Sequence, residues 1–390
     1  MVWLSNVLFL VAGIGLTIVM VEYLSAVRHL RERPPTPKGT PGISILKPLC
    51  GIDDDLEANL ACFAELDYPN YEVLLGLKSV DDPAHAVARA AAGRWPRIFR
   101  LVMQRGEPGL NAKVNQLLTL EPEARHELLL ISDSNVRVGA GYLSEIAALF
   151  ERPETGLVTH PIIGVGDETL GALFDRLHLA SLVTPGMISG KRIAGQDFVV
   201  GKSMAMRRGD LAAMGGFESV KDVLAEDFIL GSRVGKQLGK RTEVGHQPVV
   251  NVSHQLGVGD FFLRYTRWNV IQRRLIGRFL FSFQLLLNPV ALGLLGLFAC
   301  PTRHRLVAFL LLALTKILAD AGSRTVQERS PIRLRHLVFT PVKDLLIFGS
   351  WLRAMVTNEV VWRGNRLRVL AGTRLEPIRD PKPEVRPEGL

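Results

Sequence analysis

The stretch Glu127-Leu-Leu-Leu-Ile-Ser-Asp-Ser-Asn135 is the most informative part of the sequence for the fold class. Its first part, Glu127 to Ser132, is an apolar run too short for a helix and typical of a strand buried on both faces. An acid and an amide follow directly, Asp133 and Asn135, and alternate side chains of extended backbone point to the same side. Ligands of parallel α/β sheets bind beyond the carboxyl ends of the strands, so we expect chemistry at this point.

Strand and helix patterns alternate on the N-terminal side of this stretch. Gly42 to Leu46 and Tyr71 to Leu77 are short apolar runs typical of strands, and Leu56 to Leu66 and Pro83 to Ala92 have helical spacing. Leu157 to Thr159 is a further candidate strand. This βαβ alternation predicts an α/β domain with a mostly parallel sheet.

The N-terminus is apolar enough to cross a membrane. No residue from Met1 to Val21 is charged, and about 20 such residues span the hydrocarbon. A cleaved signal peptide is the alternative, but no basic region precedes the run and no small-residue cleavage site follows it. The basic residues after the run predict that the remainder lies in the cytoplasm. These are Arg28, Arg31, Arg33 and Lys38.

Three further apolar segments lie near the C-terminus. We expect Phe279 to Cys300 to span the membrane, with a kink at Asn288-Pro289. Leu306 to Ala319 contains Lys316, and Phe339 to Met355 contains three charged residues, so these two are candidates for spans, re-entrant segments or interfacial helices. Arg-rich stretches flank the last segment on both sides, which leaves the topology of this end open.

The composition agrees with a membrane protein. The 390 residues carry a formal charge of +9, with a pI near 9.7 and a mean hydropathy of +0.19. Basic residues beside apolar segments indicate contact with lipid headgroups or a nucleotide, and we expect no nucleic acid partner. Three scattered cysteines exclude a disulfide framework and a cysteine-rich zinc site, and they are typical of a reducing compartment.

These patterns divide the chain into five parts. We predict an N-terminal anchor, a basic and proline-rich linker, a cytosolic domain, C-terminal membrane segments and a basic tail whose end, from Ile378, has the composition of a disordered segment. The corresponding residues are 1–27, 28–41, 42–278, 279–356 and 357–390.

Three acidic sites are candidates for chemistry. Asp82 follows a strand and precedes Pro83, where the alternative is a helix cap. Asp133 and Asn135 offer the carboxylate and amide oxygens that Mg²⁺ or Mn²⁺ prefers. Asp227, in Leu224-Ala-Glu-Asp-Phe228, begins an apolar segment that we expect to be helical, where a solvated charge is the alternative.

A basic motif precedes the C-terminal apolar segments. Arg264 and Arg267 lie three residues apart on one helix face, with Trp268 beside them. Such a patch can simply contact lipid phosphate. Three separated acidic sites followed by this RxxRW motif form a combination that isolated helix caps do not explain.

In these motifs the chain resembles the ceramide glucosyltransferase family, also called glycosyltransferase family 21, and the similar bacterial hopanoid-type enzymes. These are inverting membrane enzymes with a GT-A nucleotide-sugar-binding domain. The resemblance covers Pro41-Gly-Ile-Ser-Ile-Leu-Lys-Pro-Leu49, Glu65-Leu-Asp-Tyr-Pro69, Tyr71-Glu-Val-Leu-Leu75, Asp81-Asp-Pro83, Asn111-Ala-Lys-Val-Asn115, Asp133-Ser, Ala225-Glu-Asp227, Arg264-x-x-Arg-Trp268 and Trp362-Arg-Gly-Asn-Arg-Leu-Arg368. It implies transfer of a sugar from a UDP-sugar to a lipid hydroxyl at the cytosolic membrane face.

The resemblance also implies roles for single residues. Asp82 matches the aspartate that contacts the nucleotide, Asp133 the one at the diphosphate and metal, and Asp227 the catalytic base. The basic motif matches the residues that hold the diphosphate and shape the acceptor side, which are Arg264, Arg267 and Trp268. Lys47 and Lys113 are candidate helpers, with a surface cation as the alternative.

Two positions depart from the family pattern. The D-x-D motif of related enzymes is Asp133-Ser-Asn135 here, so a Mg²⁺ or Mn²⁺ ion has one carboxylate fewer. His160 lies one place out of step with a family histidine, and we assign it no role.

The chemistry expected of these residues is a single displacement at the anomeric carbon. Asp227 would take the proton of the acceptor hydroxyl as the new bond forms. A divalent ion at Asp133, with Arg264 and Arg267, would stabilise the charge that gathers on the departing UDP. We expect the segment from Leu170 to Ile188 either to lie in the membrane interface or to pack on the sheet.

Other functions compete with this one. A processive polysaccharide synthase shares the acidic triad, but the chain offers few spans for a polymer channel. A non-enzymatic membrane-anchored scaffold for nucleotide or lipid would need no base at Asp227. Glucose or N-acetylglucosamine as the donor sugar, and ceramide, diacylglycerol or a hopanoid as the acceptor, all stay open. The composition favours a GC-rich bacterial source, and therefore the bacterial inner membrane.

Overall fold

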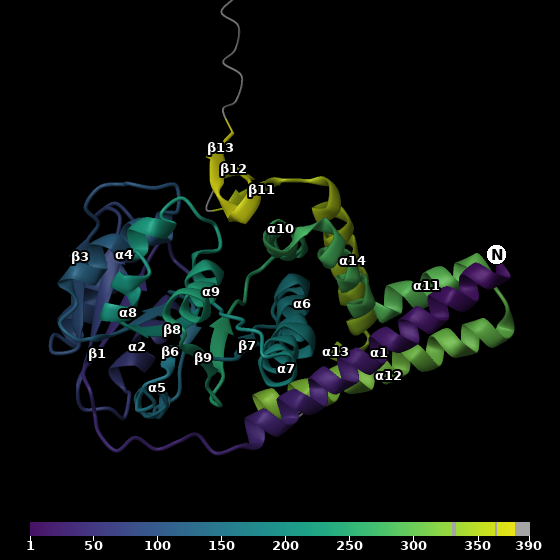
Figure 1. Cartoon of the computed structure of the whole chain (residues 1–390), viewed down its shortest axis with the longest axis horizontal. Helices are drawn as coiled ribbons and strands as arrows, with labels where there is room; N and C mark the ends of the chain where they lie inside the picture. Colours follow the sequence, from purple (N-terminus) through teal and green to yellow (C-terminus); the bar gives the residue numbers. More distant parts are fainter. Residues whose placement is uncertain (330–332, 363–364, 379–390) are drawn as a thin grey trace, which may run out of the picture.

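The computed structural model describes residues 1–329, 333–362 and 365–378. A seven-stranded sheet forms the centre of the α/β domain, in the order β3-β2-β1-β4-β8-β6-β9 (Figure 1). Its strands are β1 (Ile43–Pro48), β2 (Tyr71–Leu77), β3 (Phe99–Met103), β4 (Leu128–Ser132), β6 (Thr155–Thr159), β8 (Ser203–Arg207) and β9 (Arg241–Val244).

The first half of this sheet is parallel. Strands β3, β2, β1 and β4 pair in parallel, whereas β8 runs antiparallel between β4 and β6. All five residues of β4 are buried, as expected for a strand covered on both faces. The prediction of an α/β fold with a mostly parallel sheet is therefore confirmed. The antiparallel β8 was not predicted.

Helices cover both faces of the sheet. On one face, Ile45 and Leu130 pack with α2 (Leu56–Ala64), α3 (Ala84–Arg94) and α5 (Tyr142–Phe150). On the other, Leu46 and Leu129 pack with α4 (Ala112–Glu123), α8 (Arg208–Ala213) and α9 (Glu226–Leu238). Neighbouring residues of one strand thus belong to different cores, because side chains alternate along it.

A second sheet begins directly after Asp133-Ser-Asn135. It contains β5 (Val136–Arg137), β10 (Val249–Val252) and β7 (Ile162–Val165) in the order β5-β10-β7. Helix α6 (Leu170–His178) continues through a π-helical turn, Leu179–Val183, into α7 (Thr184–Ala194). Most apolar side chains of α6 are buried, and α6 contacts β7 and α10 (Val258–Ser282) while α7 contacts α1 (Val2–Arg31). This segment therefore packs within the protein.

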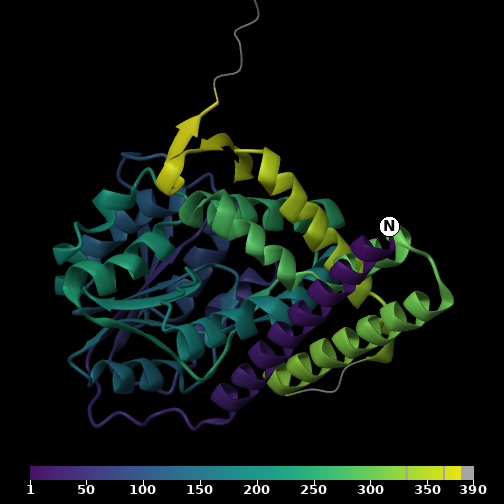
Figure 2. The same ribbon diagram turned by 45° about the vertical axis from the view of Figure 1, so that its right-hand side comes forward.

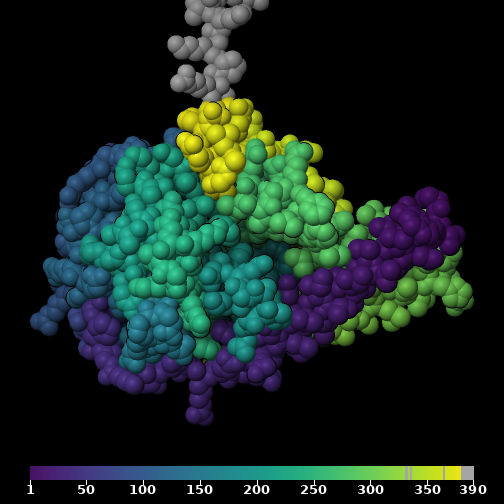
Figure 3. Space-filling view, viewed as in Figure 1, coloured from purple at the N-terminus to yellow at the C-terminus, as the bar shows by residue number. Residues whose placement is uncertain are grey.

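Three helices form an arm that projects from the domain (Figures 2 and 3). They are α1, α11 (Pro289–Ala299) and α12 (Arg303–Glu328). Among the described residues, α1 and α12 are each long and apolar enough to cross a membrane. Leucine side chains of α12 are exposed along the arm, as expected for a lipid-facing surface: Leu306, Leu310, Leu311, Leu314 and Leu318.

The expected single span from Phe279 to Cys300 is bent. The segment Val258–Leu287, which joins α10 to the 3₁₀ turn Phe283–Leu287, meets α11 at an angle of 80°. The break lies at Asn288, directly before Pro289. Proline disfavours helical geometry in the preceding residue, so the kink is sharper than predicted, and this pair is a broken span or a re-entrant loop.

Contacts at the two ends of the arm show the relative direction of its long helices. The Ser5 hydroxyl donates to the Gly296 carbonyl, and Arg305 donates to Asn6. At the other end of α12, Ser323 donates to the Ala180 carbonyl beside the α/β domain. Helices α1 and α12 therefore run in the same direction, and both reach the domain at their C-terminal ends.

Lys316 does not prevent α12 from being an apolar helix, because its charge is neutralised. Its ammonium lies 2.6 Å from Asp320 and 3.5 Å from Asp344 of α14 (Thr340–Val356). Lys343 in turn lies 2.7 Å from Asp344 and 3.2 Å from Asp320. Paired charges of this kind can be buried, whereas single ones cannot. Helix α14 has 17 residues, fewer than the roughly 20 apolar residues of a typical membrane span.

The expected basic tail is folded in its first part. Strands β11 (Glu359–Trp362), β12 (Asn365–Val369) and β13 (Leu375–Pro377) form an antiparallel sheet. The amides of Leu224 and Leu375 donate hydrogen bonds to the carbonyls of Thr373 and Asp222, so this sheet is fixed beside the start of α9. The prediction of disorder from Ile378 falls on residues 379–390, outside the described residues.

Candidate active site

Asp133 lies at the carboxyl end of β4, between two lysines. Lys113, near the start of α4, places its ammonium 2.9 Å from Asp133 Oδ1. Lys202, directly before β8, places its ammonium 3.3 Å from Asp133 Oδ2. Lys47 donates to the Asp133 backbone carbonyl at 2.7 Å. The adjacency of β1, β4 and β8 in the sheet brings Lys47 and Lys202 to Asp133.

Lys113 also connects Asp133 to the start of α9. Its ammonium lies 3.2 Å from Glu226 Oε1 and donates to the Gly201 carbonyl at 3.0 Å. The Gly201 amide donates to Asp227 Oδ2 at 2.7 Å, and the Phe228 amide donates to Asp227 Oδ1 at 2.8 Å. Three of the predicted site residues, Lys113, Asp133 and Asp227, therefore form one cluster.

The charges of this cluster shift its pKa values. Burial and, to a smaller extent, the neighbouring Glu226 raise the pKa of Asp227 to about 6, against the effect of Lys113. Burial also raises the pKa of Asp133, but Lys113 and Lys202 lower it more, to well below its usual range. Asp227 is thus a better proton acceptor near neutral pH than Asp133.

A chain of hydrogen bonds joins this cluster to the RxxRW helix. Lys202 donates to Asn135 Oδ1 at 2.8 Å, and Asn135 Nδ2 donates to Asn251 Oδ1 at 3.0 Å. Asn251 Nδ2 donates to Asp175 Oδ2 at 3.2 Å, and Arg264 donates to the same oxygen at 3.0 Å. Tyr265 donates to Asp175 Oδ1 at 2.9 Å.

This chain fixes the orientation of the Asn135 amide. A lysine ammonium can only donate, so the Asn135 oxygen faces Lys202. The Asn135 nitrogen faces two acceptors, Asn251 Oδ1 and the Val252 carbonyl at 3.2 Å. An aspartate at this position could not donate to either acceptor, which gives a structural reason for asparagine in place of the second acid of D-x-D.

The remaining predicted residues lie around the cluster. Asp82, at the end of β2, accepts from the Gly51 and Ala84 amides, both at 2.9 Å, so it caps a turn and orders the loop after β1. Arg267 donates to the Val361 carbonyl of β11 at 3.3 Å. Trp268 packs edge to face on Tyr265, with ring centroids 5.3 Å apart. These hydrogen bonds and this ring contact therefore join the three residues to parts of the protein other than Asp133.

Three members of the site were not predicted as site residues: Lys202, Asn251 and Asp175. Lys202 is 69 residues from Asp133 along the chain, and Asn251 and Asp175 are 76 residues apart. The one sequence signal for Lys202 is its position between Gly201 and the alternating run Ser203–Arg207, which forms β8. His160 is buried, and its Nδ1 lies 2.8 Å from the Ser203 hydroxyl.

The expected divalent ion does not fit the side chains as they are arranged. Asp133 and Asn135 have the oxygen atoms that Mg²⁺ and Mn²⁺ prefer. However, the Lys202 ammonium donates hydrogen bonds to one oxygen of Asp133 and to the amide oxygen of Asn135. A divalent ion on the same two oxygens would lie only a few ångströms from this ammonium, where like charges repel strongly. An ion could enter only if Lys202 moved away.

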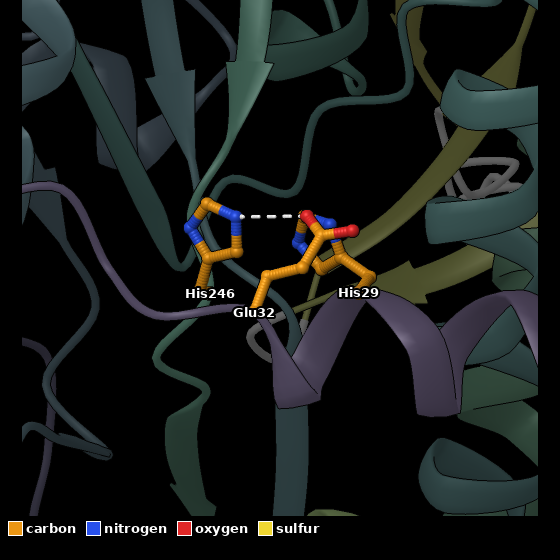
Figure 4. A group of neighbouring side chains, drawn as sticks. All are labelled: His29, Glu32 and His246. Carbon is orange, nitrogen blue, oxygen red and sulfur yellow. Dashed lines mark ion pairs between the residues drawn. The ribbon is translucent and has the colours of Figure 1, made fainter.

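A second group of histidine and glutamate side chains lies at the end of α1. His29, Glu32 and His246 face one another (Figure 4). His246 donates to Glu145 at 2.9 Å, and Arg192 of α7 lies 2.9 Å from Glu32 and 3.3 Å from His29 Nδ1. The Arg192 guanidinium therefore already interacts with the atoms that a metal ion would need. We interpret it as a clamp that fastens α1 to the α/β domain.

The fold is that of the GT-A class of glycosyltransferases. The chain matches glycosyl transferase family 21 over residues 7–375, and it belongs to that family. The resemblance found in the sequence motifs is thereby confirmed, as is the prediction of a hexosyltransferase.

The similar proteins include ceramide glucosyltransferases. Ceramide glucosyltransferase 3 of Caenorhabditis elegans is 27% identical over 274 residues, which cover 67% of this chain and 59% of the relative. The chain thus spans about three fifths of that relative's length. Ceramide glucosyltransferase 1 of the same organism is 25% identical, and the match covers 90% of this chain and 75% of the relative.

A solved structure shares the fold. The mannosyltransferase PcManGT from Pyrobaculum calidifontis, in complex with GDP-Man and Mn²⁺, superposes with a TM-score of 0.51 at 17% identity. The match covers 90% of this chain and 99% of the mannosyltransferase.

Proposed function

We propose that this protein is a membrane-bound inverting glycosyltransferase that moves glucose or N-acetylglucosamine from a UDP-sugar to a lipid hydroxyl. Ceramide and hopanoids are the acceptors that we favour. The observation that carries the proposal is the cluster in which Lys113 contacts Asp133 and Gly201, whose amide donates to Asp227. Membership of glycosyl transferase family 21 and the ceramide glucosyltransferase relatives support the same chemistry.

Asp227 is the general base in this proposal. Its two backbone hydrogen bonds, from Gly201 and Phe228, fix the carboxylate at the start of α9. Its raised pKa, near 6, suits a group that must be ionised at neutral pH and still accept a proton from the acceptor hydroxyl. Proton removal by Asp227 while the oxygen attacks the anomeric carbon gives inversion in one displacement.

Cationic side chains stabilise the departing diphosphate. Lys113 and Lys202 flank Asp133, and Arg264 reaches the same region through Asp175 and Asn135. Charge that develops on the leaving oxygen is therefore met by groups that are already in position. Asp82 would contact the nucleotide from the end of β2, and Arg267 and Trp268 would shape the acceptor side.

The acceptor lipid would arrive from the membrane beside α10. This helix carries the RxxRW motif and continues toward exposed apolar residues, among them Phe279, Leu280 and Phe283. The basic residues after α1 favour a cytoplasmic position for the domain, at the bacterial inner membrane. An acceptor hydroxyl held near the interface would then meet a donor bound from the cytosol.

Membranes that contain the protein provide the direct test. UDP-glucose and UDP-N-acetylglucosamine are offered in parallel with ceramide, diacylglycerol and a hopanoid, and Asp227→Asn is the control. We expect product with one donor and acceptor pair and none with the variant. Full turnover by Asp227→Asn would remove Asp227 from the mechanism. Absence of UDP-sugar binding would reject the proposed donor class.

A further inference from the structure

We infer that Lys202 is a resident cation of the donor site, in the position that a divalent ion would otherwise occupy between Asp133 and Asn135. The enzyme would then bind the diphosphate of its donor without a metal ion. This inference rests on the proposed function, because it concerns how the proposed donor is bound.

The contacts of Lys202 support this role. Its ammonium joins Asp133 Oδ2 at 3.3 Å to Asn135 Oδ1 at 2.8 Å, which are the two side chains predicted from the sequence to bind the metal. The Lys202 side chain is 17% exposed, so it is held inside the site and still open on one side. A surface lysine would instead extend into solvent.

The charges around Asp133 also disfavour a metal ion. Its single negative charge already faces two ammonium groups, those of Lys113 and Lys202. Asn135 adds no charge, and its nitrogen is committed to Asn251 and Val252. A divalent ion needs anionic oxygen ligands to offset its dehydration, and this pair offers one carboxylate shared with two cations.

An anionic diphosphate would complement the positive charges of this region. Lys202 and Arg264 lie at the two ends of the hydrogen-bond chain through Asn135, Asn251 and Asp175. A diphosphate that contacts both cations would gain two charge-assisted hydrogen bonds.

The test is UDP binding by calorimetry to the full-length protein in detergent, with EDTA and with Mn²⁺. We expect the wild type to bind UDP equally well, within about threefold, in both conditions. Lys202→Met should bind about tenfold or more weakly in EDTA, because a hydrogen bond to a charged group is lost, and Mn²⁺ should restore part of the affinity. Lys236→Met, which removes an exposed lysine of α9, should behave like the wild type.

A second measurement, made on the wild type, tests the inference even if Lys202→Met does not fold. Mn²⁺ binding to the wild type without nucleotide is followed by electron paramagnetic resonance, and we expect no stoichiometric binding. One Mn²⁺ per chain, lost in Asp133→Asn, would overturn the inference. So would wild-type UDP binding that is tenfold tighter with Mn²⁺ than with EDTA, or Lys202→Met binding UDP like the wild type in EDTA.

The two proposals fail in different ways. If the wild type binds UDP only with Mn²⁺, the role of Lys202 is wrong and the glycosyltransferase proposal stands. If the wild type binds no UDP in either condition, the proposed donor is wrong, and the inference that depends on it falls as well.

Discussion

The Gly201 amide donates a hydrogen bond to Asp227 Oδ2 at 2.7 Å, and a glycine at this position leaves room for that contact. A Cβ atom at residue 201 would lie 2.9 Å from that oxygen and 3.0 Å from the Lys113 ammonium, so these side-chain ends would have to shift. Glycine therefore permits a close approach between the chain before β8 and the proposed base. It links two segments that are 26 residues apart in the sequence.

Gly201→Ala should therefore lower sugar transfer by about tenfold or more, because the added methyl group displaces Asp227 from the acceptor hydroxyl. The measurement is kcat with the donor and acceptor pair found in the membrane assay. Gly93→Ala is the matched control, since nothing lies within 4 Å of a Cβ at that position in α3. Equal loss in both variants would contradict the specific role of Gly201.

The pH dependence of transfer should report Asp227. Its pKa is near 6, so kcat/KM should be level above that pH and fall about tenfold for each unit below it, as the base becomes protonated. In Asp227→Asn, any activity that a more sensitive assay detects should not change between about pH 5 and pH 8. A wild-type profile that is flat through pH 5 would show that another group is the base.

Asp227→Asn should also remove a pH dependence of stability. The folded-state pKa lies above the ordinary value of 3.8, so folded protein binds the extra proton between about pH 4 and pH 6, and Asp227 makes folding less favourable as pH rises through this window. The amide of the variant faces a backbone N–H of Gly201 or Phe228, which costs stability equally at every pH. The unfolding temperature of the variant, relative to that of the wild type, should therefore rise by about 2–4 °C between pH 4 and pH 7.5. Asp67→Asn, an exposed carboxylate, is the control. A difference that does not change with pH would argue against this origin.

Asp175→Asn should be strongly destabilising. The Asp175 carboxylate accepts from Asn251, Arg264 and Tyr265, and the amide nitrogen of the variant would face a donor. Breaking a buried charged pair costs about 3 kcal/mol or more, which lowers the unfolding temperature by about 4 °C or more. Asp197→Asn is the control, because its partly exposed pair with Lys191 contributes about 0–1 kcal/mol. A similar small effect of both variants would mean that the chain from Asn135 to Arg264 is not maintained.

Protease sites inserted at two positions can test how the protein is oriented in the membrane. A protease site in the linker at residues 35–36 should be protected in intact cells, because it lies on the side of the α/β domain. The same site at residues 301–302, between α11 and α12, should be cleaved from outside, since this turn is at the opposite end of the arm. Cleavage in the linker, or protection at 301–302, would contradict the proposed orientation.

Elements whose pattern is local could be predicted from the sequence. The four apolar residues that begin β4 indicated a buried strand, and the uncharged N-terminal run indicated a long apolar helix. Strand ends in a parallel sheet lie at one edge, so the sequence pattern made Asp133 a candidate site residue. Asp227 was a candidate from its acidic pair, its role as base came from the family resemblance, and the structure brings Asp227, Asp133 and Lys113 into one cluster.

The side chains that contact Asp133, and the charges that they place around it, depend on the tertiary structure. The position of Lys202 depends on β8 inserting antiparallel beside β4, and no periodicity in either strand specifies that neighbour. The bend at Asn288 and the folding of β11–β13 against the start of α9 likewise depend on packing between distant segments. Local patterns follow from burial and backbone geometry. Contacts between residues far apart in the sequence form only when the sheets and helices pack together, so the charge balance of the site exists only in the folded protein.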